Sequence, residues 1–413
     1  MWKAMKTNPR VYSVLGFLAI LYSVGIFWGM PSEFVPEIDS DVPIGVLSFF
    51  SHVHDSHEVI KYPAFHKIVL LPLYAGVFGY SKLTGAFHTL SSTWPFGFTD
   101  PMFATSLLIV ATRILNLIMG IGTLLCLFII LFQESKSVFN SIICLLLFGL
   151  SGAFTYYVKA ANYDGPQLFW WSLSFVFTWK YLFDRGHNAK NLWRSALFIG
   201  IATATKDQSF VFALSSGLTI LCLGSVDAHR SRLKDASIYG GIALLVYILT
   251  AIACNPVLWV WHVKYLLSAG GIYDFTIFAE FNNTLRGHVN LFYRFVKLLT
   301  DLCSIPGCLF AIIGMVYLVH NKMLKKCVAI FLPFICFYFI VVYRDRFVYE
   351  RHVLNIGFLV MVPACLGIRY CKDLLHRYHI RTGAIILGTA LSICVISQLI
   401  RGFVPVTYAQ VFD

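Results

Sequence analysis

Long apolar runs alternate with short basic loops along the whole chain, and this pattern constrains the fold more than any other feature. Of the 413 residues, 58% are hydrophobic and only 13% are charged, which is more apolar surface than a soluble protein of this size could bury. An apolar run of about 20 residues is long enough to cross a bilayer as a helix. The sequence therefore predicts an all-α polytopic membrane protein.

Two of the apolar stretches need interpretation before spans can be counted. The stretch 195–224 is too long for one span and is interrupted by "TKDQ", which predicts two helices that meet at Lys206 and Asp207. The stretch 62–80 carries two prolines and several charges, which predicts a helix lying along the outer surface. With these two changes we expect about eleven spans. The apolar stretches are 11–30, 62–80, 103–132, 138–157, 166–183, 195–224, 237–255, 303–319, 327–343, 352–370 and 382–400.

The basic loops give an orientation. If 62–80 does not span, "ESKS", "DRGHNAKNLWR", "DAHRSRLKD", "HNKMLKK" and "RYCKDLLHRYHIR" all lie on the side of the basic N-terminus. This is the positive-inside arrangement, with the N-terminus inside and the C-terminus outside. It also accounts for the net charge of +12, so we expect membrane lipids rather than nucleic acid as partners.

The predicted organisation is a single membrane domain over residues 1–413. Two long segments, 31–101 and 255–300, face outside or into a lumen and contain aromatic, partly amphipathic stretches suited to the membrane interface. The first apolar run lacks an A-x-A cleavage site, which favours an uncleaved first helix. We expect a multi-pass protein of a bacterial inner membrane or of the endoplasmic reticulum membrane, with its active site facing the periplasm or the lumen.

Charged side chains of both signs collect on the predicted outer side. Carboxylates can act as general bases, and Lys and Arg can hold a phosphate. Two elements follow the first span: "EIDSD", with Asp39 and Asp41, and "KYPAFHK", which begins at Lys61. Such a set fits a reaction between an acidic lipid headgroup and a neutral acceptor.

Four further elements occur in order along the chain. They are "ATRILNLI" with Arg113, "NYDGPQLFW" with Asp164, "GIATATKDQ" with Lys206, and "ERHVLNIGFLVMVP" with Arg351. In order and sidedness, residues 10 to 370 resemble the GT-C superfamily of glycosyltransferases that use polyprenyl- or dolichyl-phosphate sugars. The resemblance is to the branch with the protein O-mannosyltransferases and the lipid A aminoarabinose transferase.

The resemblance implies roles for the acidic residues. Asp39 matches the family's catalytic base, but Ser40 stands where the family often has Glu, so Asp41 stays a second candidate. Asp164 is implied as a further catalytic acid that orients the acceptor or the base. A carboxylate suits this work because the acceptor hydroxyl must lose its proton as it attacks the sugar. One direct displacement would invert the anomeric centre, and a double displacement would retain it.

The resemblance also implies roles in binding. Lys61, Arg351 and Lys206 are implied as ligands of the donor phosphate, whose charge must be held by fixed cations. Tyr62 and His66, in the juxtamembrane motif, are implied as contacts to acceptor or sugar. The acceptor class, whether glycan, lipid or protein, stays open. Arg113 lies inside an apolar run, so we expect it to be structural and bound to an acid or a carbonyl.

The segment "SHVHDSHE" places His52, His54 and His57 close together in the first outer loop. Such a density of imidazoles could bind a divalent metal. However, H-x-H spacing aligns two side chains only in a strand, whereas His54 and His57 align only on a helix. We therefore assign no metal ligand and no cofactor, and a divalent metal at these histidines stays an open alternative.

A secondary transporter or lipid flippase with a charged, outward-facing cavity is the main alternative. Transporters usually show inverted repeats and charges at the bilayer midplane, whereas the two halves of this chain do not mirror each other. An oligosaccharyltransferase is less favoured within the enzyme class because the sequence contains no "WWDYG" element. The sequence thus favours a hexosyl- or pentosyltransferase that uses a lipid-phosphate donor.

Overall fold

The computed structural model describes residues 8–28, 46, 63, 65–89, 91, 97–184, 188–224, 231–254, 279–378 and 381–412. In this part of the chain the structure is helical, and the β-structure is limited to one isolated bridge between Phe87 and Phe98. The prediction of an all-α protein is confirmed. The helices are α2 (Pro9–Ser23), α5 (Phe65–Leu83), α6 (Pro101–Ser135), α7 (Val138–Gly149), α8 (Gly152–Lys159), α9 (Asp164–Phe183), α10 (Ala189–Thr205), η1 (Asp207–Ser209), α11 (Phe210–Leu223), α12 (Ser231–Cys254), α14 (Leu285–Cys303), α15 (Ile305–His320), α16 (Leu324–Phe337), η3 (Tyr338–Tyr343), α17 (Glu350–Arg377), α18 (Arg381–Gln398), η4 (Leu399–Phe403) and α19 (Val404–Phe412).

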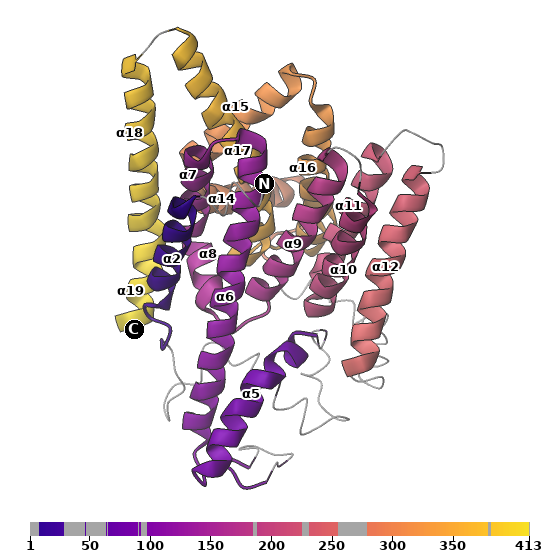
Figure 1. Ribbon diagram of the computed structural model, residues 1–413, viewed down its shortest axis with the longest axis vertical. Coiled ribbons are helices and arrows are strands. Elements are labelled where there is room, and N and C mark those ends of the chain that lie inside the picture. The colour runs from indigo at the N-terminus through magenta and orange to yellow at the C-terminus, as the bar shows by residue number, and fades with distance from the viewer. Residues whose placement is uncertain are drawn as a thin grey trace.

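Most of these helices run roughly side by side, so the bundle has two ends (Figure 1). The links α6–α7 and α15–α16 and the last turn of α17 lie at the upper end of Figure 1, and these segments carry basic residues that we expected inside. By the alternation of helix directions, α9 and α17 begin at the lower end, and α10 ends there. We call the upper end of Figure 1 the inner end of the bundle and the lower end its outer end.

Length and apolar composition identify the helices that could cross a membrane. Within the described residues, five helices qualify, and two bent pairs raise this to seven: α7 with α8, bent by 71°, and α14 with α15, bent by 100°. α5 is not among them and lies at the outer end beside α6, as expected for a surface helix (Figure 1). The count of eleven spans stays a prediction.

Two local predictions can be checked against the helix bounds. The stretch 195–224 is divided into α10 and α11, which meet at Lys206 and Asp207 as predicted. In the second outer segment, α14 is amphipathic: one face is buried through Leu291, Phe295 and Leu302. The sharp bend between α14 and α15 lets that face lie against α17 while α15 joins the bundle.

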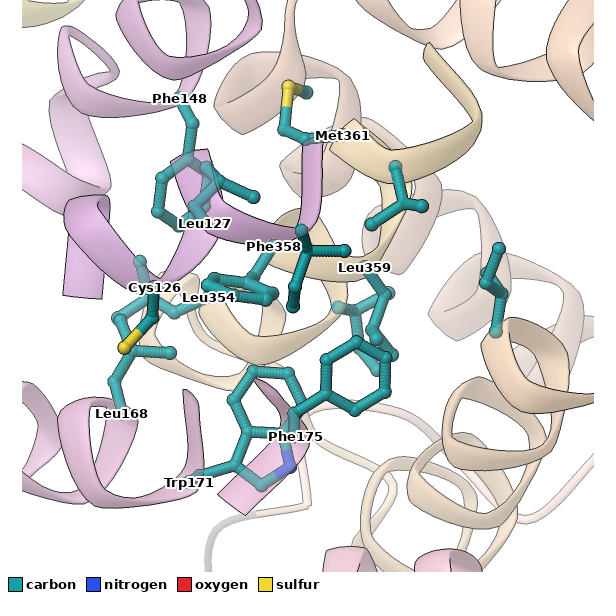
Figure 2. Packing of buried hydrophobic residues seen from close by; sticks show 14 of the residues in the cluster. Cys126, Leu127, Phe148, Leu168, Trp171, Phe175, Leu354, Phe358, Leu359 and Met361 are labelled. Carbon is teal, nitrogen blue, oxygen red and sulfur yellow. The ribbon is translucent and has the colours of Figure 1, made fainter. Parts of the chain in front are cut away.

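The centre of the bundle is α17, which is buried on all sides from His352 to Ile368. Its Phe358 ring packs edge-on against Trp171 of α9, with ring centroids 5.2 Å apart (Figure 2). α15 crosses α17 closely through Gly314 and Gly367, since a Cβ at Gly314 would lie 1.8 Å from the carbonyl oxygen of Pro363. Small residues of this kind let membrane helices approach each other closely. The packing therefore fixes the position of the outer end of α17.

Candidate functional site

Asp164 and Lys206 form an ion pair at the outer end of the bundle. Asp164 is the first residue of α9, and Lys206 directly follows α10. The two residues are 7% and 4% exposed, so each charge has lost most of its hydration. A buried charge is tolerated only with a partner, and each of these residues supplies the other's. Two of the residues assigned to the site from sequence are thus in direct contact.

The loop before α9 is tied to α6 by Asn116. This buried side chain donates from Nδ2 to the carbonyl oxygens of Ala160 and Asn162, at 2.6 and 3.1 Å. Asn162 in turn accepts the backbone N–H of Asp164 on its side-chain oxygen, at 3.0 Å. These hydrogen bonds satisfy polar groups that would otherwise be costly in this environment. They hold the Asp164 carboxylate at the start of α9.

Lys206 reaches the site because the chain breaks its helix there. The backbone of Lys206 is extended, with φ −153° and ψ 123°, and the short helix η1 begins at the next residue. The Lys206 N–H still donates to the carbonyl of Ala202, so the last turn of α10 stays intact. The change of direction after this turn lets the Lys206 side chain point to Asp164.

Arg351, in the first turn of α17, lies in the same cluster. Tyr157 is within electrostatic reach of both Asp164 and Arg351. His352 is within reach of both Arg351 and Lys206. The structure therefore brings together three residues that are far apart in sequence and were assigned from it, Asp164, Lys206 and Arg351. Tyr157 and His352 were not assigned, because neither has a sequence signal that separates it from an ordinary aromatic or polar residue at a helix end.

The N-terminal ends of α9 and α17 both lie in this cluster. The first turn of a helix presents unpaired N–H groups and a partial positive charge, which favours anions. Glu350 and Arg351 occupy that turn of α17. The backbone N–H of Tyr349 donates to Nδ1 of His352 at 3.2 Å, which fixes the entry into the helix. Arg351, Lys206 and the α17 terminus thus lie together with the carboxylates of Asp164 and Glu350.

An apolar groove begins at Asp207, the residue that follows Lys206 in the chain. It has a volume of about 780 Å³ and is lined by α10, α11, α12 and η3. Its outer end carries Asp207, Arg344 and Asp345, and farther along it the lining is mostly apolar up to Leu221. Phe210 and Leu221 are eleven positions apart, so the groove extends roughly 17 Å along α11 at about 1.5 Å per residue. The shape is that of a slot for an apolar chain with a charged group at one end.

Asp345, in the link between η3 and α17, has a perturbed acidity. Burial raises its pKa to about 6, and the guanidinium of Arg344 opposes this shift only in part. Its carboxylate oxygen is 3.9 Å from Nε of Arg344, whose side chain is half exposed. At neutral pH Asp345 is mostly ionised, and it becomes neutral in mildly acidic solution. The charge at the mouth of the groove therefore depends on pH.

His66 of α5 is the other described residue that we assigned to binding. It is fully buried, and its ring packs edge-on against Tyr163, with centroids 5.7 Å apart. Burial lowers the pKa of His66 to about 3, so the ring is neutral. In the structure His66 supports the residue before Asp164, and a contact to acceptor or sugar stays a prediction.

The other assigned residues lie outside the described residues. These are Asp39 and Asp41, Lys61 and Tyr62, and the histidines His52, His54 and His57. Within the described residues no group of three or more His, Cys, Asp or Glu side chains could hold a metal ion.

Two basic residues near the outer end are structural. Arg113 donates from Nη1 to the carbonyl oxygens of Ile26 and Trp28, at 2.8 and 2.6 Å, which confirms the expected structural role. Lys159 donates to the carbonyl of Val24 and to the hydroxyl of Thr407, both at 2.9 Å. Both side chains fasten the segment after α2 to the bundle.

Comparison with solved structures identifies the fold. No protein-family model matches the chain, and no curated protein matches it by sequence. The oligosaccharyltransferase of the archaeon Archaeoglobus fulgidus, in complex with zinc and sulfate, matches with a TM-score of 0.57 at 13% identity. The alignment covers 95% of this chain and 53% of that one. The chain has the GT-C fold.

Two further GT-C structures show the range of the likeness. The same archaeal enzyme, AglB, in complex with an inhibitory peptide and a dolichol-phosphate, matches with a TM-score of 0.52 at 12% identity, over 98% of this chain and 56% of that one. The Pmt1–Pmt2 protein O-mannosyltransferase complex of S. cerevisiae, bound to the sugar donor, gives a TM-score of only 0.39 at 16% identity, over 62% and 34%. The chain thus spans about half, or less, of the length of these GT-C proteins.

Proposed function

We propose that this protein is a membrane glycosyltransferase that transfers a sugar from a polyprenyl- or dolichyl-phosphate donor to an acceptor at the outer end of the bundle. One observation carries the proposal: Lys206 and Arg351 both lie within electrostatic reach of His352, and the apolar groove begins at Asp207, the residue after Lys206. A ligand that fills both features needs an anionic head and a long apolar tail. A lipid phosphate has this chemistry.

The groove supports a prenyl chain as the tail of the donor. Its walls are mostly apolar side chains of α11 and α12. Its volume of about 780 Å³ falls in the range of ligand pockets. Because the groove extends along the bundle from the charged end, a chain lying in it keeps its phosphate at the level of Lys206. The AglB neighbour with a dolichol-phosphate makes this lipid class reasonable for the fold.

The cations support a role in holding the leaving phosphate. When the bond from sugar to phosphate breaks, negative charge grows on the phosphate oxygens, and fixed cations lower the energy of that state. Arg351 can offer two parallel N–H groups to such oxygens, and the α17 terminus adds its own partial charge. Lys206 is held in position by Asp164, so it needs little reorganisation when the donor binds.

The pairing of Asp164 supports a positioning role for this residue. The Asp164 carboxylate accepts a hydrogen bond from the Lys206 ammonium, and using it as the base would give up this contact. Asp164 therefore orients Lys206 and the acceptor, and the base that removes the acceptor proton is Asp39 or Asp41. A single displacement with this base inverts the anomeric centre.

The donor can be identified from the purified protein. We expect mass spectrometry of lipids that copurify with the wild-type protein to find a polyprenyl or dolichyl phosphate, with or without its sugar. Lys206→Met should lower the amount, whereas Lys325→Ala, at the inner end, should not. Copurification of membrane phospholipids alone would count against the proposal. Movement of a lipid across liposomes without sugar release would favour the flippase alternative.

A further inference from the structure

A second large groove lies between α6 and α9. It has a volume of about 1370 Å³ and is separate from the groove beside Lys206, since the two share no lining residue. Its apolar walls come from side chains such as Ile118 and Leu125 on α6 and Leu173 and Phe177 on α9.

The inner end of this second groove is strongly basic. Lys136, Lys180, Arg194 and Lys326 line it together with only two acids, Glu134 and Asp184. Lys326 is already neutralised, because its ammonium lies 2.5 Å from the Glu134 carboxylate. The remaining three cations face a single carboxylate, so this end of the groove carries an excess of positive charge.

Two of these cations lie over the same aromatic ring, that of Phe177. The Lys180 ammonium and the Arg194 guanidinium are each 5.5 Å from the centre of the Phe177 ring. Asp184 is held by Gln133, whose amide donates to its carboxylate at 2.6 Å, so it neutralises at most one of them. Both cations lie over the same ring, so an anion bound next to this ring would be attracted by both.

The groove is long enough to hold one chain of a membrane lipid. Leu115 and Gln133, both in the lining, are eighteen positions apart on α6, or roughly 27 Å at about 1.5 Å per residue. One leaflet of a bilayer has a hydrocarbon thickness of about 15 Å, half of the roughly 30 Å core. An acyl chain can therefore lie along the apolar wall while its headgroup stays at the basic end.

We propose that this second groove binds one anionic phospholipid of the inner leaflet, with its phosphate next to Lys180 and Arg194 and an acyl chain between α6 and α9. The occupant is a phospholipid because the basic end lies at the inner end of the bundle, away from Asp164 and Lys206. The site would select lipids by headgroup charge. The inference is independent of the sugar-transfer reaction.

Native mass spectrometry of the delipidated full-length protein, with phosphatidylglycerol or phosphatidylcholine added, tests this site. We expect one phosphatidylglycerol to bind at least tenfold more tightly than phosphatidylcholine, and Lys180→Ala/Arg194→Ala to remove that preference. The matched control is Lys322→Ala/Lys325→Ala, which removes two exposed cations at the same end of the bundle but outside the groove. This variant should keep the preference for phosphatidylglycerol.

A melting measurement with the same lipids shows whether the variant is folded and still responsive. A ligand that binds only the folded protein raises its melting temperature. Phosphatidylglycerol should raise the melting temperature of the wild type and of the control variant, but not of Lys180→Ala/Arg194→Ala. Equal binding by both double variants, or equal affinity for the two lipids, would overturn the proposal. Preference for a polyprenyl phosphate over phosphatidylglycerol would overturn it too, in favour of a second donor site.

Discussion

The ammonium of Lys206, directly after α10, donates to the carboxylate of Asp164, the first residue of α9. The pair joins two helix ends that are 42 positions apart in sequence. Because both side chains are buried, the pair can be removed only at a cost to the folded state. Because it lies next to Arg351, it also sets the charge that a bound phosphate meets.

Breaking this pair should cost stability. Asp164→Asn leaves the buried Lys206 charge without its partner, so we expect the free energy of unfolding to fall by about 3–5 kcal/mol. The double variant Asp164→Asn/Lys206→Met should regain most of that stability without regaining activity. Thermal melts in a fixed detergent check both. Asp373→Asn, in the exposed pair with Arg369, is the control and should change stability by about 1 kcal/mol or less. An equal loss of unfolding free energy in Asp164→Asn and Asp373→Asn would show that the buried Asp164 pair matters no more to stability than an exposed pair.

Arg351 should matter for turnover far more than for folding. We expect Arg351→Ala to lower kcat/KM by about 10²-fold, the usual effect of losing one group that stabilises transition-state charge. Arg351→Lys should restore only part of the loss, because an ammonium cannot make the paired contacts of a guanidinium. Arg377→Ala, at the other end of α17, should leave the kinetics unchanged. Full activity in Arg351→Ala would remove it from the site.

The groove that begins at Asp207 can be filled without disturbing the helix. Gly240 lines it and has open space around an added Cβ, whereas Gly241 has the same open space but does not line the groove. We expect Gly240→Phe to weaken binding of a long-chain donor at least tenfold and Gly241→Phe to leave it unchanged. A short-chain donor analogue should distinguish the two variants much less. Equal effects of both substitutions would place the lipid chain elsewhere.

Donor binding should depend on pH through Asp345. The pKa of its carboxyl is raised to about 6, and a phosphodiester donor stays anionic well below that value. Binding should therefore tighten as pH falls through 6, because Asp345 loses its negative charge at the mouth of the groove. Titration of donor affinity from pH 4.5 to 7.5 measures this effect. It should be nearly absent in Asp345→Asn and retained in Asp373→Asn.

The same shift affects stability in a defined direction. The folded protein holds the Asp345 proton up to about pH 6, whereas the unfolded chain releases it near pH 3.9. Between these values the folded state binds more protons, so the Asp345 contribution to stability falls as pH rises. Asp345→Asn should remove that part of the slope. A wild-type slope that persists in the variant would assign the effect to another group.

The helices were predictable because apolar length and the position of basic loops depend on the membrane and little on tertiary contacts. The break at Lys206 was visible for the same reason, since charged residues interrupt an apolar run. The 71° bend between α7 and α8 was not predicted. Its signal is "GLSG" at 149–152, where two glycines flank Ser151, whose hydroxyl accepts the Phe154 N–H and caps α8.

The site was only partly predictable. Asp164, Lys206 and Arg351 could be assigned from their order and sidedness, but their contact depends on how α9, α10 and α17 pack. Asn116 gave a signal, because an amide inside an apolar run requires a partner, yet nothing in the sequence indicates that the partner is the loop before Asp164. Lys159 resembled a loop cation, and only the fold shows that it is a buried anchor.

The most direct test of the account is consumption of a lipid-phosphate sugar. The purified protein in nanodiscs would be given a panel of polyprenyl- and dolichyl-phosphate sugars, and free polyprenyl or dolichyl phosphate would be measured by mass spectrometry. We expect the wild type to release the phosphate from at least one donor, and Arg351→Ala and Lys206→Met to release about 10²-fold less. Release by these variants at the wild-type rate would contradict the central claim, as would wild-type protein that binds such donors and never cleaves them.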